Sequence, residues 1–283
     1  GFTGNPVTYT ITVNPEPTAN VPANATYCPG DPVPAANFTS NPAGATYTWT
    51  NSNTAIGLAA SGNGNTPAFT ATNTGTTPIT GTITVTPTLN GCTGNPVTYT
   101  ITVNPEPTAN VPANATYCPG DPVPAANFTS NPTGATYTWT NSNTAIGLAA
   151  SGNGNTPAFN ATNTGTTPIT GTITVTPTLN GCTGNPVTYT ITVNPTPPAP
   201  TAAGVTICPN NSATLTATAP GGNYEWYDAA TGGNLLGSNA SYTTPVLTNN
   251  TTYYVQTTVN GCVSPRTAVT VTIAPALVVN AGV

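Results

Sequence analysis

Six cysteines are the residues of this chain best suited to covalent chemistry. They are Cys28, Cys92, Cys118, Cys182, Cys208 and Cys262. An even number of cysteines is typical of disulfide-bonded proteins in an oxidising, extracellular compartment. No CxxC pair and no histidine accompanies them, which argues against a metal centre. We therefore expect all six to form disulfide bonds.

The positions of the cysteines leave two pairing schemes open. The first closes each domain on itself with the pairs Cys28–Cys92, Cys118–Cys182 and Cys208–Cys262. The rival scheme joins neighbours across linkers, with the pairs Cys92–Cys118 and Cys182–Cys208, and leaves Cys28 and Cys262 without partners. The first scheme uses every cysteine and is preferred. Each bond would stabilise its domain by roughly 4 kcal/mol in the chain-entropy description.

The acidic residues are too few and too scattered for catalysis. They are Glu16, Asp31, Glu106, Asp121, Glu225 and Asp228. A nucleophilic triad needs a base, and the chain has no histidine or lysine to provide one. Glu225 and Asp228 could approach each other, but a solvated pair flanking Trp226 is the simpler interpretation. We expect no enzyme activity and no catalytic residues.

Calcium is the one cofactor worth weighing, because tandem extracellular domains can be made rigid by it at their junctions. A calcium site needs six to eight oxygen ligands, usually with several carboxylates. Each expected junction offers one acid, Glu16 or Glu106, and the third offers Thr196 instead. The sequence therefore predicts no cofactor and no metal.

Charged residues make up only 2% of the chain, and Arg266 is the single cation. Binding to a phosphate backbone depends on lysine and arginine, so no nucleic-acid partner is expected. The net charge of -5 is too dilute for an acidic patch. Solubility must come from threonine, asparagine, serine and glycine.

A tandem repeat organises the chain. The stretch from Thr3 to Pro15 returns at 93–105 and at 183–195, and residues 1–90 differ from residues 91–180 at three positions only. A period of 90 residues is the size of an independent sandwich domain, not of a solenoid layer. Within the recurring stretch, apolar residues alternate with threonines, which predicts a strand with one buried face.

The repeat predicts the domain organisation. We expect residues 1–14 to be the last strand of a preceding domain, or alternatively a donor strand for another molecule. Two sandwich domains follow at 15–104 and 105–194, then a Pro-rich linker at 195–200, a third sandwich at 201–275, and the start of a further segment at 276–283.

Within residues 15–104, the alternation predicts about seven short strands, which favours an all-β sandwich. Expected strands include 35–39, 44–50 and 79–88, and 51–64 is expected to be a loop. Asn90-Gly91 predicts a two-residue hairpin turn, and the same dipeptide returns at Asn180-Gly181 and Asn260-Gly261. The three tryptophans are expected to be core anchors, with exposed sugar-stacking platforms as the alternative. They are Trp49, Trp139 and Trp226.

A resemblance covers nearly the whole chain. Modules that carry Tyr27-Cys28-Pro29-Gly30-Asp31, Tyr47-Thr48-Trp49 and Gly91-Cys92-Thr93-Gly94 resemble the PKD-like repeats of giant Bacteroidota surface adhesins. Residues 201–275, with Ile207-Cys208-Pro209, Tyr224-Glu225-Trp226 and Gly261-Cys262, are similar to the Ig-like domain that accompanies those repeats. The resemblance implies export by type IX secretion, a location on the cell surface with attachment to the outer membrane, and a role in gliding motility.

Composition, repeat and resemblance together predict a non-enzymatic stalk segment. In this hypothesis, tandem Ig-like/PKD-like β-sandwiches form an elongated rod that bears load and holds an adhesive region away from the cell. Its partners would be the other domains of the same long chain, an anchoring outer-membrane protein of unknown identity, and surface glycans or substratum. The alternatives are a carbohydrate-binding module that uses loops such as 51–64, or a subunit of a self-assembling filament of the donor-strand type.

Overall fold

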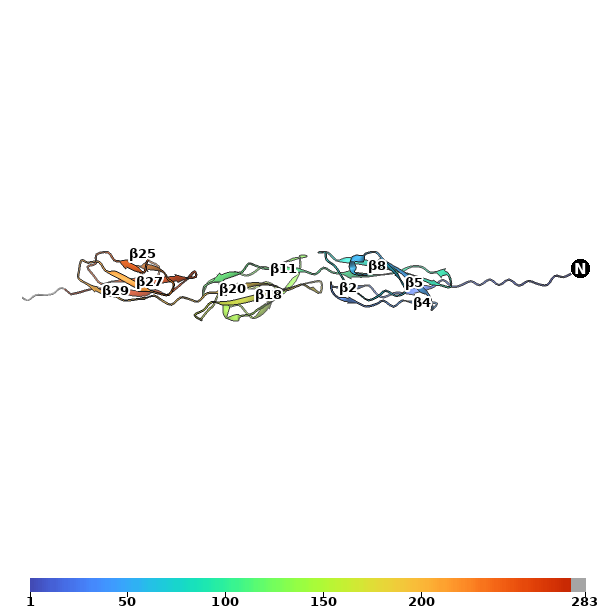
Figure 1. The fold of residues 1–283 in the computed structure, drawn as a ribbon, viewed down its shortest axis with the longest axis horizontal. Coiled ribbons are helices and arrows are strands. Elements are labelled where there is room, and N and C mark those ends of the chain that lie inside the picture. Colours follow the sequence, from blue (N-terminus) through green and yellow to red (C-terminus); the bar gives the residue numbers. More distant parts are fainter. Residues whose placement is uncertain (276–283) are drawn as a thin grey trace, which may run out of the picture. The chain divides into compact units, whose positions relative to one another are not determined.

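The computed structural model describes residues 1–275 as β-strands joined by turns, with two short 3-10 segments and no α-helix in that range (Figure 1). Contacts divide the chain into two compact units. Unit 1 comprises Gly1–Val111, Phe128–Thr138 and Val175–Val187, and unit 2 comprises Pro112–Asn127, Trp139–Thr174 and the chain from Thr188 onward. The first repeat lies within unit 1, the third within unit 2, and the second is shared between them.

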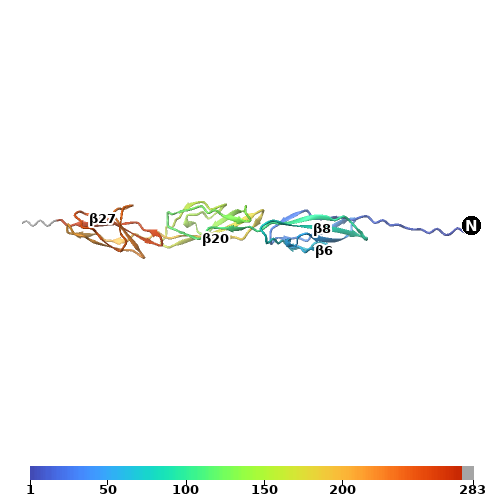
Figure 2. The ribbon, with the colours of Figure 1, turned by 90° about the horizontal axis from the view of Figure 1, so that it is seen from above.

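The first repeat is a sandwich of one large sheet and two small ones (Figures 1 and 2). The large sheet has the order β2-β10-β8-β5-β6, with β9 paired to β8, and the small sheets are β1-β4 and β3-β7. The strands are β1 (Thr18–Asn20), β2 (Ala25–Tyr27), β3 (Pro32–Val33), β4 (Thr39–Asn41), β5 (Thr46–Asn51), β6 (Ser61–Asn63), β7 (Phe69–Thr70), β8 (Ile79–Leu89), β9 (Cys92–Thr93) and β10 (Val97–Val103).

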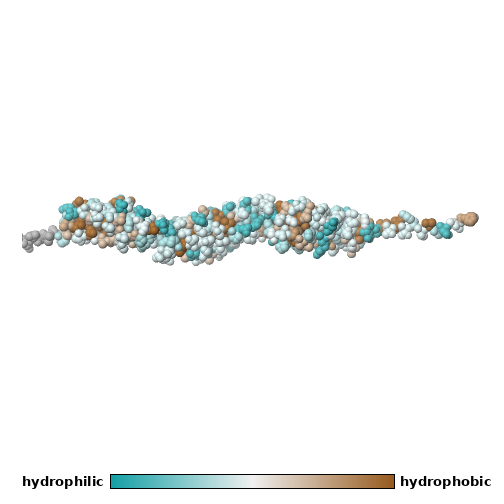
Figure 3. All heavy atoms as spheres, in the orientation of Figure 1, coloured by the Kyte–Doolittle hydropathy of each residue, from teal (hydrophilic) through white to brown (hydrophobic). Residues whose placement is uncertain are grey.

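The predicted alternation forms the core of this repeat. In β8, Ile83 and Val85 are fully buried, while Thr82, Thr84 and Thr86, which alternate with them, are partly exposed. In β10, Tyr99 and Ile101 are buried in the same cluster as Trp49. Period-two patterning thus places one face of each long strand between the sheets. The other face carries threonine hydroxyls that water can solvate. The face drawn in Figure 3 is accordingly mostly pale, with scattered apolar and hydrophilic residues.

The sheets are mainly antiparallel, but β2 pairs with β10 in the parallel sense. Its register sets Ala25 against Ile101 and Tyr27 against Val103. Two strands 76 residues apart in sequence therefore run in the same direction and end at the same pole of the sandwich. The residues after β2 and after β10 lie together at that pole.

The second repeat follows the same plan, with a large sheet in the order β12-β20-β18-β15-β16, β19 paired to β18, and small sheets β11-β14 and β13-β17. Its strands are β11 (Thr108–Asn110), β12 (Ala115–Tyr117), β13 (Pro122–Val123), β14 (Thr129–Asn131), β15 (Thr136–Asn141), β16 (Ser151–Asn153), β17 (Phe159–Asn160), β18 (Ile169–Leu179), β19 (Cys182–Thr183) and β20 (Val187–Val193).

The third repeat differs in sequence and keeps the strand order of the large sheet, but its small strands form one sheet instead of two. Its large sheet has the order β22-β29-β27-β24-β25, with β28 paired to β27, and a three-stranded sheet β21-β23-β26 faces the same core. Its strands are β21 (Thr201–Ala202), β22 (Val205–Ile207), β23 (Thr214–Thr218), β24 (Asn223–Tyr227), β25 (Leu235–Gly237), β26 (Ser241–Thr243), β27 (Thr251–Val259), β28 (Cys262–Val263) and β29 (Thr267–Ile273).

The expected strand at 35–39 is wrong. Phe38 is buried, but the strand begins only at Thr39. The Ala36 amide donates to the Thr66 hydroxyl and the Phe38 amide to Asn65 Oδ1, so side chains satisfy backbone groups that a strand would pair in a ladder.

The expected loop at 51–64 is partly wrong as well. It contains the 3-10 segment η1 (Thr54–Ile56) and the edge strand β6. Within it, Ile56 and Leu58 lie in the core, with exposed fractions of 0% and 2%. The equivalent 3-10 segment of the second repeat is η2 (Thr144–Ile146).

Residues 1–14 pair with no strand among the described residues. Their assignment to a preceding domain, or to a donor strand, stays a prediction. The segment expected at 276–283 lies outside the described residues. Within the described part of the chain, no helix is long and apolar enough to cross a membrane.

Candidate functional site: the junctions between repeats

Disulfide bonds join successive repeats. Cys28 of the first repeat is bonded to Cys182 of the second, and Cys118 of the second is bonded to Cys262 of the third, with Cα–Cα distances of 5.4 and 5.5 Å. Both pairing schemes expected from the sequence are therefore wrong. The other two cysteines, Cys92 and Cys208, carry free thiols in this structure. Each of the two bridges lies inside one compact unit.

The strand directions explain why a repeat cannot close on its own cysteines. Cys28 follows β2, whose last residue, Tyr27, lies beside Val103 at the end of β10. Cys92 precedes Val103 by eleven residues of mostly extended chain, a span of up to about 36 Å at 3.3 Å per residue. A disulfide tolerates a Cα–Cα distance of about 4.4–6.8 Å. Cys28 and Cys92 thus lie at opposite poles of one sandwich.

At one pole the cysteine begins a tight turn, Cys28-Pro29-Gly30-Asp31. Gly30 has a φ of 91°, which glycine adopts without steric cost. The Asp31 carboxylate accepts a hydrogen bond from the Cys28 amide, with an N–O distance of 2.7 Å, and so holds the turn closed. In the second repeat, the Asp121 carboxylate accepts from the Cys118 amide at the same distance. Asp31 and Asp121 therefore position the bridging cysteines.

At the opposite pole the cysteine directly follows the predicted hairpin turn. Asn180 and Gly181 have φ values of 50° and 84°, as a type I′ turn requires. Cys182 then pairs with Leu179 across the hairpin. Asn90-Gly91 and Asn260-Gly261 form the same turn. The hairpin prediction is confirmed in all three repeats.

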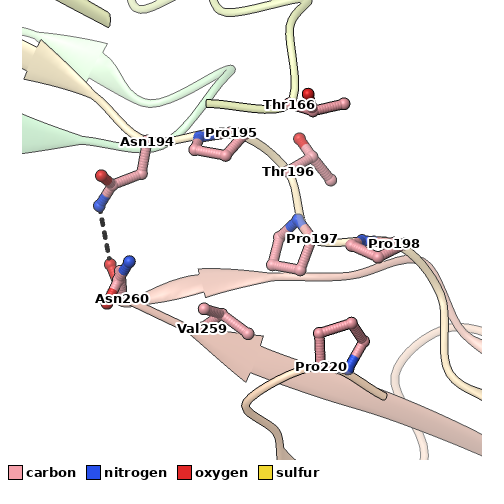
Figure 4. A pocket seen from close by; sticks show the side chains of 9 residues that line it. All are labelled: Thr166, Asn194, Pro195, Thr196, Pro197, Pro198, Pro220, Val259 and Asn260. Atoms are coloured by element: carbon pink, nitrogen blue, oxygen red, sulfur yellow. Dashed lines mark hydrogen bonds between the residues drawn. The ribbon is translucent and has the colours of Figure 1, made fainter. Parts of the chain in front are cut away.

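An asparagine reinforces each bridge. Asn104 follows β10, its amide donates to the Tyr27 carbonyl, and its side-chain Nδ2 donates to the Asn180 carbonyl of the next hairpin at 3.1 Å. Asn194 makes the equivalent bond to Asn260 at 3.1 Å (Figure 4). Both asparagines are buried. Because buried polar groups are costly when unpaired, these bonds hold the end of one repeat against the hairpin of the next.

Prolines and a glycine complete the junction. Pro105 and Pro107 are buried at the first junction. A Cβ on Gly184 would stand 1.7 Å from the Pro107 carbonyl oxygen, so only glycine allows this close approach. At the second junction, Asn194 to Pro198 border a mainly apolar groove of about 550 Å³, with Pro220 and Val259 on its far side (Figure 4). Both junctions thus contain buried prolines, Pro105 and Pro107 at the first and Pro197 and Pro200 at the second.

Two family models match parts of this chain. Residues 25–107 and 115–197, more than half of the chain, match the family model of the PKD-like domain. The chain belongs to the PKD-like domain family. Residues 197–275 match the CHU_C-associated Ig-like domain, which places the third repeat in that family. No curated protein matches the chain. Tandem PKD-like and Ig-like domains with disulfide bonds indicate an extracellular structural or adhesion-related region.

Several solved structures resemble the chain at low identity. Domains A168–A170 of titin share 15% identity over 89% of this chain and 97% of that one, with a TM-score of 0.38. Protocadherin gammaB7 EC3-6 shares 14% over 92% and 74%, with a TM-score of 0.38. Mouse cadherin-23 EC22-24 shares 11% over 92% and 99%, with a TM-score of 0.37.

The acids at the PKD-like junctions do not converge. Glu106 accepts a hydrogen bond from Asn185 Nδ2 at 2.9 Å, and Glu16 is exposed. Among residues 1–275, no group of three histidine, cysteine or acidic side chains gathers as metal ligands would.

Glu225 and Asp228 belong to separate hydrogen-bond groups in the Ig-like repeat. Glu225 Oε2 accepts from Gln256 Nε2 at 2.8 Å and from the Tyr227 hydroxyl at 3.1 Å. Desolvation and then this bond to Glu225 raise the pKa of Tyr227. Asp228 accepts two bonds from Asn234, first from its backbone amide, and these lower the pKa of the Asp228 carboxyl. Neither acid faces a second acid, as a paired-carboxylate mechanism would require.

Arg266 connects these two hydrogen-bond groups. Its guanidinium donates to Gln256 Oε1 at 2.9 Å and to the carbonyls of Ala229 and Gly232 at 2.6 and 2.7 Å. It also lies 3.5 Å from the centre of the Tyr227 ring, which is cation–π distance. The single cation of the chain is therefore engaged in holding the Asp228–Asn234 loop on the sheet.

The tryptophans are core anchors, as predicted. Trp49 and Trp139 are 4% exposed, and Trp226 is fully buried. Buried rings cannot stack on a sugar, so the sugar-platform interpretation is wrong for all three. Gly62 lies directly over the Trp49 ring, which closes that face.

Proposed function

We propose that this chain is a non-enzymatic stalk segment of a large repetitive cell-surface adhesin, which holds an adhesive region away from the cell and bears load. The observation that carries the proposal is the covalent joining of each repeat to the next, through Cys28–Cys182 and Cys118–Cys262. A binding module needs no such link between domains. A spacer under tension does, because its junctions would otherwise be its weakest points.

The two bridges overlap along the chain, since Cys118 lies between Cys28 and Cys182. They shorten the covalent path from residue 1 to residue 275 from 274 residue steps to about 104, which at full extension corresponds to about 370 Å instead of about 990 Å. While the disulfides are intact, more than half of the contour length of a pulled segment would therefore stay enclosed by them, even after every repeat has unfolded. Load-bearing in an elongated rod is consistent with this arrangement.

Force spectroscopy on the 275 described residues tests the proposal. We expect the oxidised chain to extend to about 370 Å and the reduced chain to about 990 Å, with junctions that resist force until the repeats themselves unfold. A junction that opens at negligible force in the oxidised chain would contradict a load-bearing role. Attachment to the outer membrane, type IX secretion and gliding motility belong to the same proposal through the adhesin resemblance. Surface localisation of the longer protein in the source cells would test them.

A further inference from the structure

We propose that Cys92 and Cys208 each form a disulfide bond to a further repeat, of the same kind as Cys28–Cys182 and Cys118–Cys262. Cys92 would bond to the turn cysteine of a repeat that precedes the first, and Cys208 to the hairpin cysteine of a repeat that follows the third. The occupant of each is thus a further repeat of this kind. The inference shares the two observed disulfides with the proposed function but does not depend on adhesion or load, so the partners of Cys92 and Cys208 can be tested separately from that function.

Cys92 occupies the position of the two bonded hairpin cysteines. It follows Asn90-Gly91, with φ values of 49° and 82°, and it pairs with Leu89 as Cys182 pairs with Leu179. The bonded cysteines Cys182 and Cys262 are each 1% exposed, whereas Cys92 is only half-buried. At the other two hairpins, the cysteine is bonded to the turn cysteine of a neighbouring repeat, and in the described part of the chain Cys92 has no such neighbour.

Independent support comes from the chain that enters this pole. Asn14 Nδ2 donates to the Asn90 carbonyl at 3.4 Å, the bond that Asn104 and Asn194 make at the two bridged junctions. Asn14 nevertheless stays exposed, while its two counterparts are buried. The asparagine contact of a junction is thus present beside Cys92 without the repeat that would cover it.

The stretch before Asn14 indicates the same partner. Tyr9, Ile11 and Val13 are 86%, 74% and 86% exposed. The residues identical to them in β10 are buried to 4% exposure or less and form the core of the first repeat. Such exposed apolar alternation is costly in water and is removed when a sandwich forms around it. A preceding repeat that takes up this strand would bring its turn cysteine to the pole where Cys92 lies.

Cys208 occupies the position of the bonded turn cysteines. Asn210 has a φ of 62° and its amide donates to the Leu247 carbonyl at 2.9 Å, as the Gly30 amide does to Ala71. After β29, the Ala274 amide donates to the Ile207 carbonyl, as that of Asn104 does to Tyr27. The turn thus has the bridge-forming shape, yet Cys208 is exposed where Cys28 and Cys118 are half-buried.

The chemistry is ordinary thiol–disulfide exchange. The thiolate of one cysteine attacks a low-molecular-weight disulfide such as oxidised glutathione and forms a mixed disulfide, with release of one small thiol. The second cysteine then displaces the other small thiol. One S–S bond forms in the protein, one is reduced in the oxidant, and the two protein protons end on the two small thiols.

Extension of the chain by one repeat at its start tests the Cys92 half. Because residues 1–14 continue the repeat in sequence, a copy of residues 15–90 placed before Gly1 gives one further PKD-like repeat. After oxidation with glutathione, we expect non-reducing peptide mapping to find the copied Cys28 bonded to Cys92, with Cys28–Cys182 and Cys118–Cys262 unchanged. The matched control, in which the copied Cys28 is replaced by serine, should leave Cys92 free to alkylate.

The Cys208 half is tested separately by appending a copy of residues 195–275 after Ala274. We expect the copied Cys262 to bond to Cys208 and the copied Cys208 to become the free thiol. A folded extra repeat, shown by protected amide hydrogens, in which Cys92 or Cys208 stays reduced would overturn the corresponding half. Bonds that form between chains, or within the added repeat, would overturn it too. An added repeat that shows no protection also counts against the inference, because the same sequence folds within the present chain.

Discussion

The first and third repeats differ in their interiors and agree at their poles. In the PKD-like first repeat, Trp49 Nε1 is buried without a hydrogen-bond partner in the described structure, whereas in the Ig-like third repeat Trp226 Nε1 donates to the Asn239 carbonyl at 2.9 Å. The third repeat also stacks Tyr242 on Trp226.

Their polar interactions differ as well. The first repeat relies on buried asparagines, such as Asn73, whose side-chain amide donates to the carbonyls of Thr77 and Val103 at 2.9 and 2.8 Å. The third repeat uses the Arg266 cluster instead. Asparagine amides satisfy backbone groups without charge, so the first repeat needs no ion pair.

The poles carry the same devices in both repeats. Each has a turn cysteine beside the end of its last strand and an Asn-Gly-Cys hairpin at the other end. A core can be repacked in many ways as long as it is filled, but a bridge to the next repeat demands one geometry. The first and third repeats therefore share the link to their neighbours and differ in their interiors.

The largest expected effect on stability comes from removing a disulfide at the poles that the first and third repeats have in common. Cys182→Ser removes the bridge to Cys28, which closes a loop of 154 residues. We expect a loss of about 4–5 kcal/mol in the free energy of unfolding on the chain-entropy description, measured by urea titration. Cys92→Ser is the matched control, since its thiol is free and the change should leave stability nearly unaltered. Equal effects of the two substitutions would contradict the disulfide map.

A smaller effect separates the first repeat from the third. At the position where the third repeat has Ser264, a Cβ on Gly94 would lie 1.7 Å from the Pro17 carbonyl oxygen. Gly94→Ala should therefore destabilise the first repeat by about 3 kcal/mol, because backbone must move.

Gly4→Ala is the control for that change. Gly4 has the same sequence neighbours, and nothing lies within 4 Å of its added Cβ. Chemical denaturation of both variants measures the difference in the free energy of unfolding. A Gly94→Ala variant as stable as Gly4→Ala would contradict the close contact between Gly94 and the Pro17 carbonyl.

Arg266→Gln should weaken the third repeat alone. It removes the cation from the Tyr227 ring and the bonds to the Ala229 and Gly232 carbonyls. We expect a loss of about 1.5–3 kcal/mol, the usual range for hydrogen bonds to a charged group. Amide hydrogens around Asp228 should exchange faster in the variant, and exchange rates in the first repeat should not change. Uniform loss of protection across repeats would mean that their interiors are coupled.

The smallest expected effect is a pH dependence confined to the third repeat. Hydrogen bonds from Asn234 lower the pKa of Asp228 in the folded state. A carboxyl with a depressed folded pKa contributes stability above its unfolded pKa and loses that contribution as the pH falls through the folded value, hence below about pH 4. Asp228→Asn should remove this acid sensitivity. Thermal unfolding between pH 2 and pH 6, compared for the two chains, measures it.

Much of each repeat could be predicted from local pattern. Alternation located β8 and β10, and the Asn-Gly dipeptides located all three hairpins, because period-two burial and positive φ are properties of neighbouring residues. Prediction failed where side chains replaced a ladder, as Thr66 and Asn65 do for the amides of Ala36 and Phe38. It also missed β6, whose glycine is there to lie over Trp49.

The repeat, the all-β class, the hairpins and the buried face of each long strand follow from the amino-acid sequence alone. The disulfide partners depend on the three-dimensional arrangement of the strands. The parallel pairing of β2 with β10 sends Cys28 to the pole opposite Cys92, and this pairing joins strands 76 residues apart. Counting cysteines cannot show it, because a disulfide depends on the distance between two Cα atoms and not on the number of residues between them.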